Sequence, residues 1–106
     1  MIAEGANAPL TVDADAALNA RGVLILPDIL ANAGGVVVSY FEWVQDIQAY
    51  FWGSGEVTSR LREVMTRSYQ HVRGEAQSNG ITLRDAAFRI AVTKVAEATR
   101  VRGIYP

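Results

Sequence analysis

A short apolar run, Val23-Leu24-Ile25-Leu26, constrains the fold of this chain more than any other feature. Its side chains do not alternate between polar and apolar, a pattern typical of a strand that is covered on both faces. A helix is predicted over Val12–Ala20, because Thr11 can cap its start and Gly22 can end it. A strand-like segment at residues 1–3 precedes this helix. Strand, helix and strand within the first 26 residues predict a βαβ unit with parallel strands.

The turns after the two predicted strands are expected to lie close together. Parallel strands of an open α/β sheet end at one edge, where ligands bind, and this places Asn7 and Asn32 near one crevice. Asn32 opens the run Asn32-Ala33-Gly34-Gly35 and is interpreted as the N-cap of the next helix. The two glycines of this run let backbone N–H groups approach a ligand closely. The sequence therefore predicts a ligand-facing corner at this strand-to-helix junction.

After residue 31 the apolar residues recur at helical spacing, which predicts three long helices. The first covers about residues 32–50, the second about residues 56–78 and the third about residues 83–102. Asn79-Gly80 is a strong stop for the second helix, and Thr82 with an aspartate three residues later resembles a capping box for the third.

The same spacing predicts which residues share a helix face. One stripe of the first long helix contains Gly35, Val36, Ser39, Trp43, Ile47 and Tyr50. The inward side of the third contains Ala86, Ala87, Ile90, Ala91, Val95 and Ala98. The predicted fold class is therefore α/β, with a short βαβ edge followed by three long α-helices.

Composition argues against several classes of function. The formal net charge is −1, so the chain has no basic field that could hold nucleic acid or an anionic membrane. No cysteine is present, which excludes a disulfide framework and a thiolate metal site. His71 is the single histidine, and no metal site or catalytic triad is expected around it. The longest apolar runs are far shorter than a bilayer span, and a cytoplasmic location is expected.

Several segments together resemble one known family. They are Glu4-Gly5-Ala6-Asn7, Pro27-Asp28, Asn32-Ala33-Gly34-Gly35-Val36, Ser39-Tyr40-Phe41-Glu42-Trp43 and the closing residues 96–106. In this order they are similar to the C-terminal segment of the Glu/Leu/Phe/Val dehydrogenases, over essentially the whole chain. The resemblance implies that residues 1–31 end a Rossmann-like dinucleotide-binding domain. It also implies that residues 32–106 are a helical region packing toward the substrate domain, in one compact unit.

The resemblance further implies an activity and roles for named residues. The activity is the NAD- or NADP-dependent interconversion of L-glutamate with 2-oxoglutarate and ammonia, carried out by a homo-oligomer. Ser39 matches the serine that hydrogen-bonds the substrate's side-chain carboxylate, and Val36 matches a wall of that pocket. Asn7 and Asn32 match positions near the nicotinamide ribose and the bound substrate, and Gly5 is assigned with them to cofactor binding. Members that act on leucine, phenylalanine or valine lack this serine, so glutamate is the favoured substrate.

Each of these assignments has a structural alternative. Asn7 and Asn32 could be turn and cap residues without a ligand, and the Ser39 hydroxyl could bond back to the carbonyl of Gly35. The Gly-Gly pair could mark a turn or a close packing contact. The flanking family residues favour the ligand roles over these alternatives.

The chain also lacks parts that a complete dehydrogenase needs. It contains no Gly-x-Gly-x-x-Gly phosphate loop, and its one lysine, Lys94, lies in the middle of the third long helix. No catalytic residue is therefore predicted here, and the isolated chain is expected to be an inactive part of a larger enzyme. The alternative is a free-standing, non-enzymatic helical interaction module. A small nucleotide-binding protein is disfavoured because the phosphate loop is missing.

Overall fold

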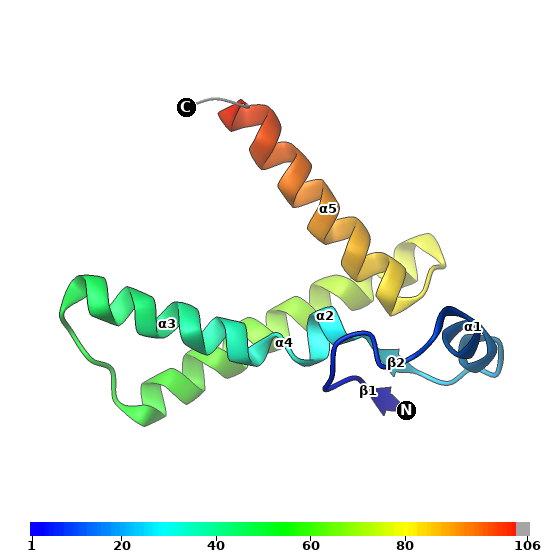
Figure 1. Cartoon of the computed structure of the whole chain (residues 1–106), viewed down its shortest axis with the longest axis horizontal. Helices are drawn as coiled ribbons and strands as arrows, with labels where there is room; N and C mark the ends of the chain where they lie inside the picture. The colour runs from blue at the N-terminus through cyan, green and yellow to red at the C-terminus, as the bar shows by residue number, and fades with distance from the viewer. Residues whose placement is uncertain (104–106) are drawn as a thin grey trace.

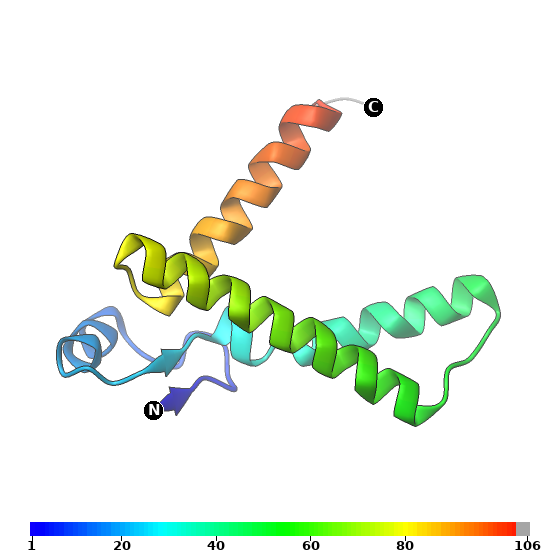
Figure 2. The same cartoon turned by 180° about the vertical axis from the view of Figure 1, so that it is seen from behind.

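Two short strands and five helices make up residues 1–103, the part of the chain that this computed structural model describes. In chain order they are β1 (Ile2–Ala3), α1 (Val12–Ala20), β2 (Ile25–Leu26), α2 (Asp28–Ala31), α3 (Gly34–Gln48), α4 (Ser54–Asn79) and α5 (Leu83–Arg102). In Figures 1 and 2, α3 and α4 form a long antiparallel hairpin, and α5 begins near the end of α4 that lies away from the loop of this hairpin. The strands lie on one side of α4, and the C-terminal end of α5 lies on the other side (Figure 1). The last residues of the closing motif, 104–106, lie outside the described residues.

The two strands pair in parallel, as the βαβ prediction requires. Ile2 lies opposite Ile25, and the Ile2 N–H donates to the carbonyl of Leu24 at 2.8 Å. β2 is shorter than the predicted strand, because the Val23 N–H bonds to the carbonyl of Leu18 and so belongs to the turn that follows α1. Thr11 caps α1 as predicted, with its Oγ1 accepting from the Ala14 N–H at 3.3 Å. The predicted α/β class is confirmed.

Asn32 does not cap α3, so this part of the sequence interpretation was wrong. A single-turn helix, α2, precedes it, and Asn32 is the C-cap of that helix, donating its N–H to the carbonyl of Asp28 at 3.1 Å. Ala33, which precedes α3, already has helical dihedral angles (φ −61°, ψ −17°). An N-cap residue normally has an extended backbone. Because Ala33 at this position is already helical, the Asn32 side chain does not cap α3.

The boundaries of the long helices follow local signals closely. α3 ends at Gln48, two residues before the predicted end, because Ala49 adopts the left-handed conformation (φ 49°). α4 starts at Ser54, slightly earlier than predicted, and ends at the predicted Asn79-Gly80 stop. α5 begins after Thr82, whose Oγ1 accepts from the Asp85 N–H at 3.1 Å. None of the described helices combines the length and apolar character that a membrane span requires.

The hydrophobic core lies where α2, α4 and α5 meet. Its buried residues are Leu30, Val72, Ala76, Ala86 and Ala87. Val95 and Ala98 were predicted to face inward, but both are exposed, because the second half of α5 extends beyond the other described elements (Figure 2). The predicted stripe on α3 is also exposed. α3 packs on α4, and Phe41, which is not part of the stripe, is buried.

Candidate functional site

Residues from both strand-end turns and from the start of α3 line one shallow concavity. It has a volume of about 590 Å³ and is open to solvent. The lining residues are Gly5, Ala6, Asn7, Asn32, Gly35, Val36 and Ser39. All five residues that the sequence analysis assigned to ligand binding are among them. The structure thus brings these residues together, while their binding roles stay predictions.

Two of the lining residues, Asn7 and Asn32, are hydrogen-bonded to each other. Asn32 Nδ2 donates to Asn7 Oδ1 at 2.7 Å, across 25 positions of sequence. The two residues follow adjacent parallel strands, so the expectation that they lie at one sheet edge is confirmed. A carboxamide has donors and acceptors for more than one hydrogen bond. The pair can therefore form further hydrogen bonds with a ligand.

Ser39 and Val36 lie about one helical turn apart on α3, and both line the concavity. Ser39 is exposed, and 75% of the Val36 residue surface is accessible to solvent. Among residues 1–103, the Ser39 hydroxyl makes no hydrogen bond to the Gly35 carbonyl, although Thr99 bonds to the carbonyl of Val95 in that way at 2.9 Å. Within the described chain, the structural alternative for Ser39 is therefore not realised.

The glycines of the concavity are not required by packing inside the described chain. A Cβ atom added at Gly5 or at Gly35 would meet no atom within 4 Å. The start of α3 carries no side-chain cap, which leaves its first-turn N–H groups without a side-chain acceptor. A helix N-terminus of this kind favours negatively charged groups. This end of the concavity suits a carboxylate.

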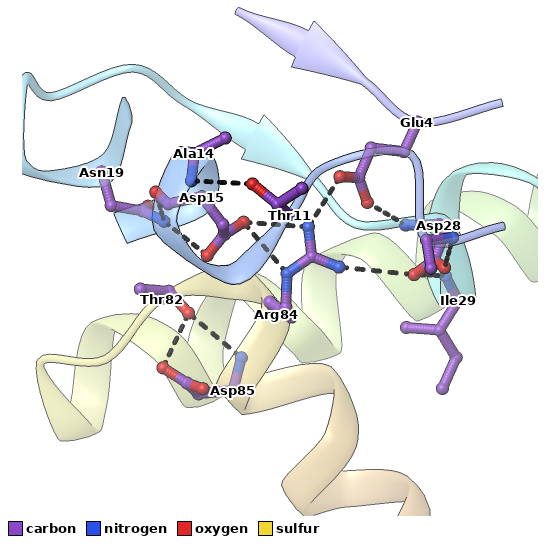
Figure 3. A network of polar contacts seen from close by, with 11 residues as sticks. Glu4, Thr11, Ala14, Asp15, Asn19, Asp28, Ile29, Thr82, Arg84 and Asp85 are labelled. Carbon is purple, nitrogen blue, oxygen red and sulfur yellow. Dashed lines mark hydrogen bonds and ion pairs between the residues drawn. The ribbon is translucent and has the colours of Figure 1, made fainter. Parts of the chain in front are cut away.

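A largely buried ionic network lies next to the two turns that follow β1 and β2, and the sequence analysis missed it. Figure 3 shows Arg84, at the start of α5, among three carboxylates. Its Nη2 lies 2.7 Å from Glu4 Oε1 and 2.9 Å from Asp15 Oδ1, and its Nη1 lies 3.4 Å from Asp28 Oδ1. The Glu4 side chain has no exposed surface. The one local signal for this network was a charged residue, Glu4, directly after the first strand, and that position does not identify its partner.

The network also bonds the backbone of both turns. Glu4 Oε2 accepts from the Asp28 N–H at 2.8 Å, and Asp28 Oδ2 accepts from the Ala8 N–H at 2.7 Å. The Ala8 N–H bond is the main cause that lowers the pKa of Asp28 below its usual 3.8, followed by the Ile29 N–H bond. The bond to Glu4 is the main cause that raises the pKa of Arg84. Both groups stay charged at neutral pH.

No metal centre is formed by the residues in the range 1–103. They contain no group of three or more His, Asp or Glu side chains arranged to hold a metal ion. The carboxylates of Glu4, Asp15 and Asp28 converge on a guanidinium instead. Lys94 lines a separate hollow on α4 and α5 together with His71, away from the concavity.

Solved structures of glutamate dehydrogenases share this fold. The chain superposes on the enzyme of Peptoniphilus asaccharolyticus with a TM-score of 0.90 and 38% identity, covering 98% of this chain and 27% of that one. The hetero-hexameric enzyme of Thermus thermophilus, in a leucine-bound form, gives a TM-score of 0.93 with 40% identity, covering 98% and 26%.

Curated relatives and a family profile agree with these structures. The chain is 49% identical over 105 residues to the glutamate dehydrogenase of Thermotoga maritima, covering 99% of this chain and 25% of the relative. It is 50% identical over 103 residues to the catabolic NAD-specific glutamate dehydrogenase RocG of Bacillus subtilis, covering 97% and 24%. The chain thus spans about a quarter of these relatives' length. The profile of the Glutamate/Leucine/Phenylalanine/Valine dehydrogenases matches residues 1–103, and the chain belongs to this family.

Proposed function

We propose that this chain is the C-terminal part of an NAD-dependent glutamate dehydrogenase and supplies one wall of the cleft that binds L-glutamate and the cofactor. The observation that carries the proposal is the shared concavity of Gly5, Asn7, Asn32, Val36 and Ser39. The relatives named NAD-specific glutamate dehydrogenases favour NAD over NADP and glutamate over the other amino acids of the family. The complete enzyme would deaminate L-glutamate oxidatively to 2-oxoglutarate and ammonia.

Within this proposal, Ser39 and Val36 form the substrate side of the wall. The exposed Ser39 hydroxyl donates a hydrogen bond to the side-chain carboxylate of glutamate, and Val36 packs against its methylene groups. The positive end of α3 adds about 0.3–1 kcal/mol of attraction for that carboxylate. A substrate with an apolar side chain would leave the Ser39 hydroxyl without a hydrogen-bond partner, so such a substrate would bind more weakly than glutamate.

The residues of the two turns fit one end of the cofactor. The side-chain carboxamides of Asn7 and Asn32 can hydrogen-bond the nicotinamide ribose, and Gly5 lets the ligand approach the backbone. NAD supplies the hydride acceptor when it is bound. The sequence contains no glycine loop for its phosphates, so these residues hold only the nicotinamide end. We assign residues 1–31 to the end of the dinucleotide-binding domain and residues 32–106 to the helical region that packs toward the substrate domain.

The isolated 106-residue chain is proposed to be inactive. It lacks the phosphate loop, and its single lysine, Lys94, lies away from the concavity. The complete enzyme is proposed to be a homo-oligomer, in which neighbouring parts cover the exposed apolar residues of α3. A cytoplasmic location stays a prediction from the sequence.

The test uses the enzyme expressed from the full open reading frame that encodes this sequence. Ser39→Ala is expected to raise the KM for glutamate about tenfold or more, the effect of one hydrogen bond to a charged group, with the affinity for NAD unchanged. Ser59→Ala, at an exposed position of α4, is the matched control and should leave both parameters unchanged. An unchanged glutamate KM in Ser39→Ala would reject the substrate role, and absence of glutamate-dependent NAD reduction in the unmutated enzyme would reject the activity.

The exposed face of α3 supports a second candidate function, a free-standing helical interaction module. Val36, Tyr40, Trp43 and Ile47 are all more than half exposed and could contact a partner protein. The native mass in the source cell separates the two functions. A mass near 11.5 kDa without a longer precursor would favour the module, whereas a chain several times longer would favour the dehydrogenase.

A further inference from the structure

Arg84 connects three elements that are distant in sequence. Glu4 follows β1, Asp15 lies in α1 and Asp28 begins α2, and the guanidinium reaches all three carboxylates from the start of α5. The Arg84 side chain is 23% exposed and the Glu4 side chain is not exposed at all. A buried carboxylate requires a paired cation, and the planar guanidinium can satisfy several acceptors at once, which an ammonium group cannot do with the same geometry.

Two of these carboxylates, those of Glu4 and Asp28, hydrogen-bond backbone N–H groups next to the concavity. Glu4 bonds the backbone N–H of Asp28, and Asp28 bonds the N–H of Ala8, the residue directly after Asn7. On its other side, the carbonyl of Asp28 accepts the N–H of Asn32 at 3.1 Å. Asp28 therefore bonds the turns on both sides of the asparagine pair.

The turn that carries Asn7 has a backbone conformation that needs such support. Ala8 has a positive φ of 45°, which is uncommon for a residue with a Cβ atom. Conformations of this kind persist where surrounding contacts hold them in place. The 2.7 Å bond between the Ala8 N–H and Asp28 Oδ2 is such a contact.

Arg84 itself does not line the concavity, so it can act there only through other residues. We propose that Arg84 is a positioning residue for the site: through Glu4 and Asp28 it holds the two turns in the arrangement that joins Asn7 to Asn32. This inference rests on the proposed function for its effect on NAD. It also links the last helix, α5, to the cofactor side of the cleft.

The cofactor side of the site and the substrate side are held by different contacts. Ser39 and Val36 lie on α3, which packs on α4, and no residue of α3 takes part in the ion pairs of Arg84. Loss of the Arg84 contacts is therefore expected to weaken NAD binding about tenfold, the effect of one net hydrogen bond, and to change the glutamate KM by less than about twofold. A general loss of folding would instead lower the amount of active enzyme and leave the affinities unchanged.

The experiment compares Arg84→Gln, Arg84→Lys and the control Arg89→Gln in the full-length enzyme. Arg89 is on the same helix and pairs with Glu75 at 3.1 Å, so its removal breaks an ion pair between α4 and α5 without touching the turns. The first measurement is hydrogen–deuterium exchange of peptides covering residues 5–10 and 27–33 in the cofactor-free enzyme. The second is the NAD dissociation constant by calorimetry, together with the glutamate KM.

Faster exchange in both peptides of Arg84→Gln, an intermediate rate in Arg84→Lys and no change in Arg89→Gln are the expected results. Unchanged exchange in the Arg84 variants would overturn the proposal, whatever the activity. If Arg84→Gln does not accumulate as folded protein, Arg84→Lys provides the same comparison because it keeps a cation beside Glu4. An unmutated enzyme without glutamate-dependent NAD reduction would reject the proposed function, while the exchange data would still decide whether Arg84 positions the turns.

Discussion

Arg84 Nη2 lies 2.7 Å from Glu4 Oε1, although 80 positions of sequence separate the two residues. The contact joins the end of the first strand to the start of the last helix. Because the Glu4 side chain is fully enclosed, this pair brings a charge into the interior and neutralises it there. The N-terminal turns and the C-terminal helix of the described chain are thereby tied to each other, beside the core where α4 and α5 pack.

Replacement of Arg84 by Met is expected to lower the free energy of unfolding by about 3–5 kcal/mol, because it leaves a buried carboxylate without its cation. Arg67→Met is the matched control, since Arg67 makes an exposed ion pair with Glu63 at 3.6 Å and such pairs contribute about 0–1 kcal/mol. Urea unfolding of the 106-residue chain, followed by far-ultraviolet circular dichroism, measures both. Equal changes in the two variants would contradict a stabilising role for the buried pair.

Gln45 connects α3 to the loop that follows it. Its Oε1 accepts the Trp52 N–H at 2.6 Å and its Nε2 donates to the carbonyl of Phe41 at 3.0 Å, with the residue 8% exposed. Gln45→Leu leaves the Trp52 N–H without this acceptor and should destabilise the chain by about 1–3 kcal/mol. Gln48→Leu, at an exposed position near the end of α3, should change stability by less than about 0.5 kcal/mol in denaturant unfolding. A smaller effect at position 45 than at position 48 would refute this role.

The lowered pKa of Asp28 predicts a pH dependence of stability. Because the folded state lowers this pKa below 3.8, the ionised carboxylate stabilises the fold above that value. This contribution is lost as the pH falls through the folded-state pKa. Between about pH 5 and about pH 2, Asp28→Asn should therefore lose less stability than the unmutated chain does.

Asp46→Asn, at an exposed position of α3, is the matched control for the pH measurement. It should follow the unmutated chain over the same range of pH. Thermal unfolding at a series of pH values gives the three slopes. Identical slopes for the unmutated chain and Asp28→Asn would show that Asp28 does not contribute to the acid sensitivity.

Two glycines, Gly74 inside α4 and Gly80 directly after it, should respond to replacement by alanine in opposite directions. Gly74 lies inside the helix, and an added Cβ would meet nothing within 4 Å, so Gly74→Ala should stabilise the chain by about 0.5–1 kcal/mol. Gly80 has equal space, but its φ of 63° is left-handed, and Gly80→Ala should cost about 1–2 kcal/mol. Denaturant midpoints measure both changes. A loss of stability in Gly74→Ala, or none in Gly80→Ala, would contradict the backbone argument.

Local signals in the sequence predicted most of the secondary structure. Thr11 and Thr82 mark the starts of α1 and α5, and Gly22 and Gly80 mark two helix ends. These features act over three or four residues, so they can be interpreted without knowing the neighbours. The location of the candidate site was also predictable, because parallel strands end at one edge and family motifs follow both strands.

The tertiary structure decided which contacts these local elements make. Asn32 ends α2 and bonds Asn7 instead of capping α3, and no local pattern distinguishes these two uses of an asparagine. Val95 has the spacing of an inward residue, yet it is exposed because α5 extends beyond the other described elements at that point (Figure 2). The partners of Arg84 come from three distant segments, and the position of an arginine in a helix does not identify them.

The sequence by itself therefore determined the order of the two strands and of the four longer helices, the caps at Thr11 and Thr82, and the residues that meet at the corner after each strand. Folding in three dimensions determined how that corner is held. The physical reason is the range of the interactions: capping and periodicity depend on neighbours along the chain, whereas the enclosure of Glu4 and its neutralisation by Arg84 exist only once the first strand and the last helix are packed together.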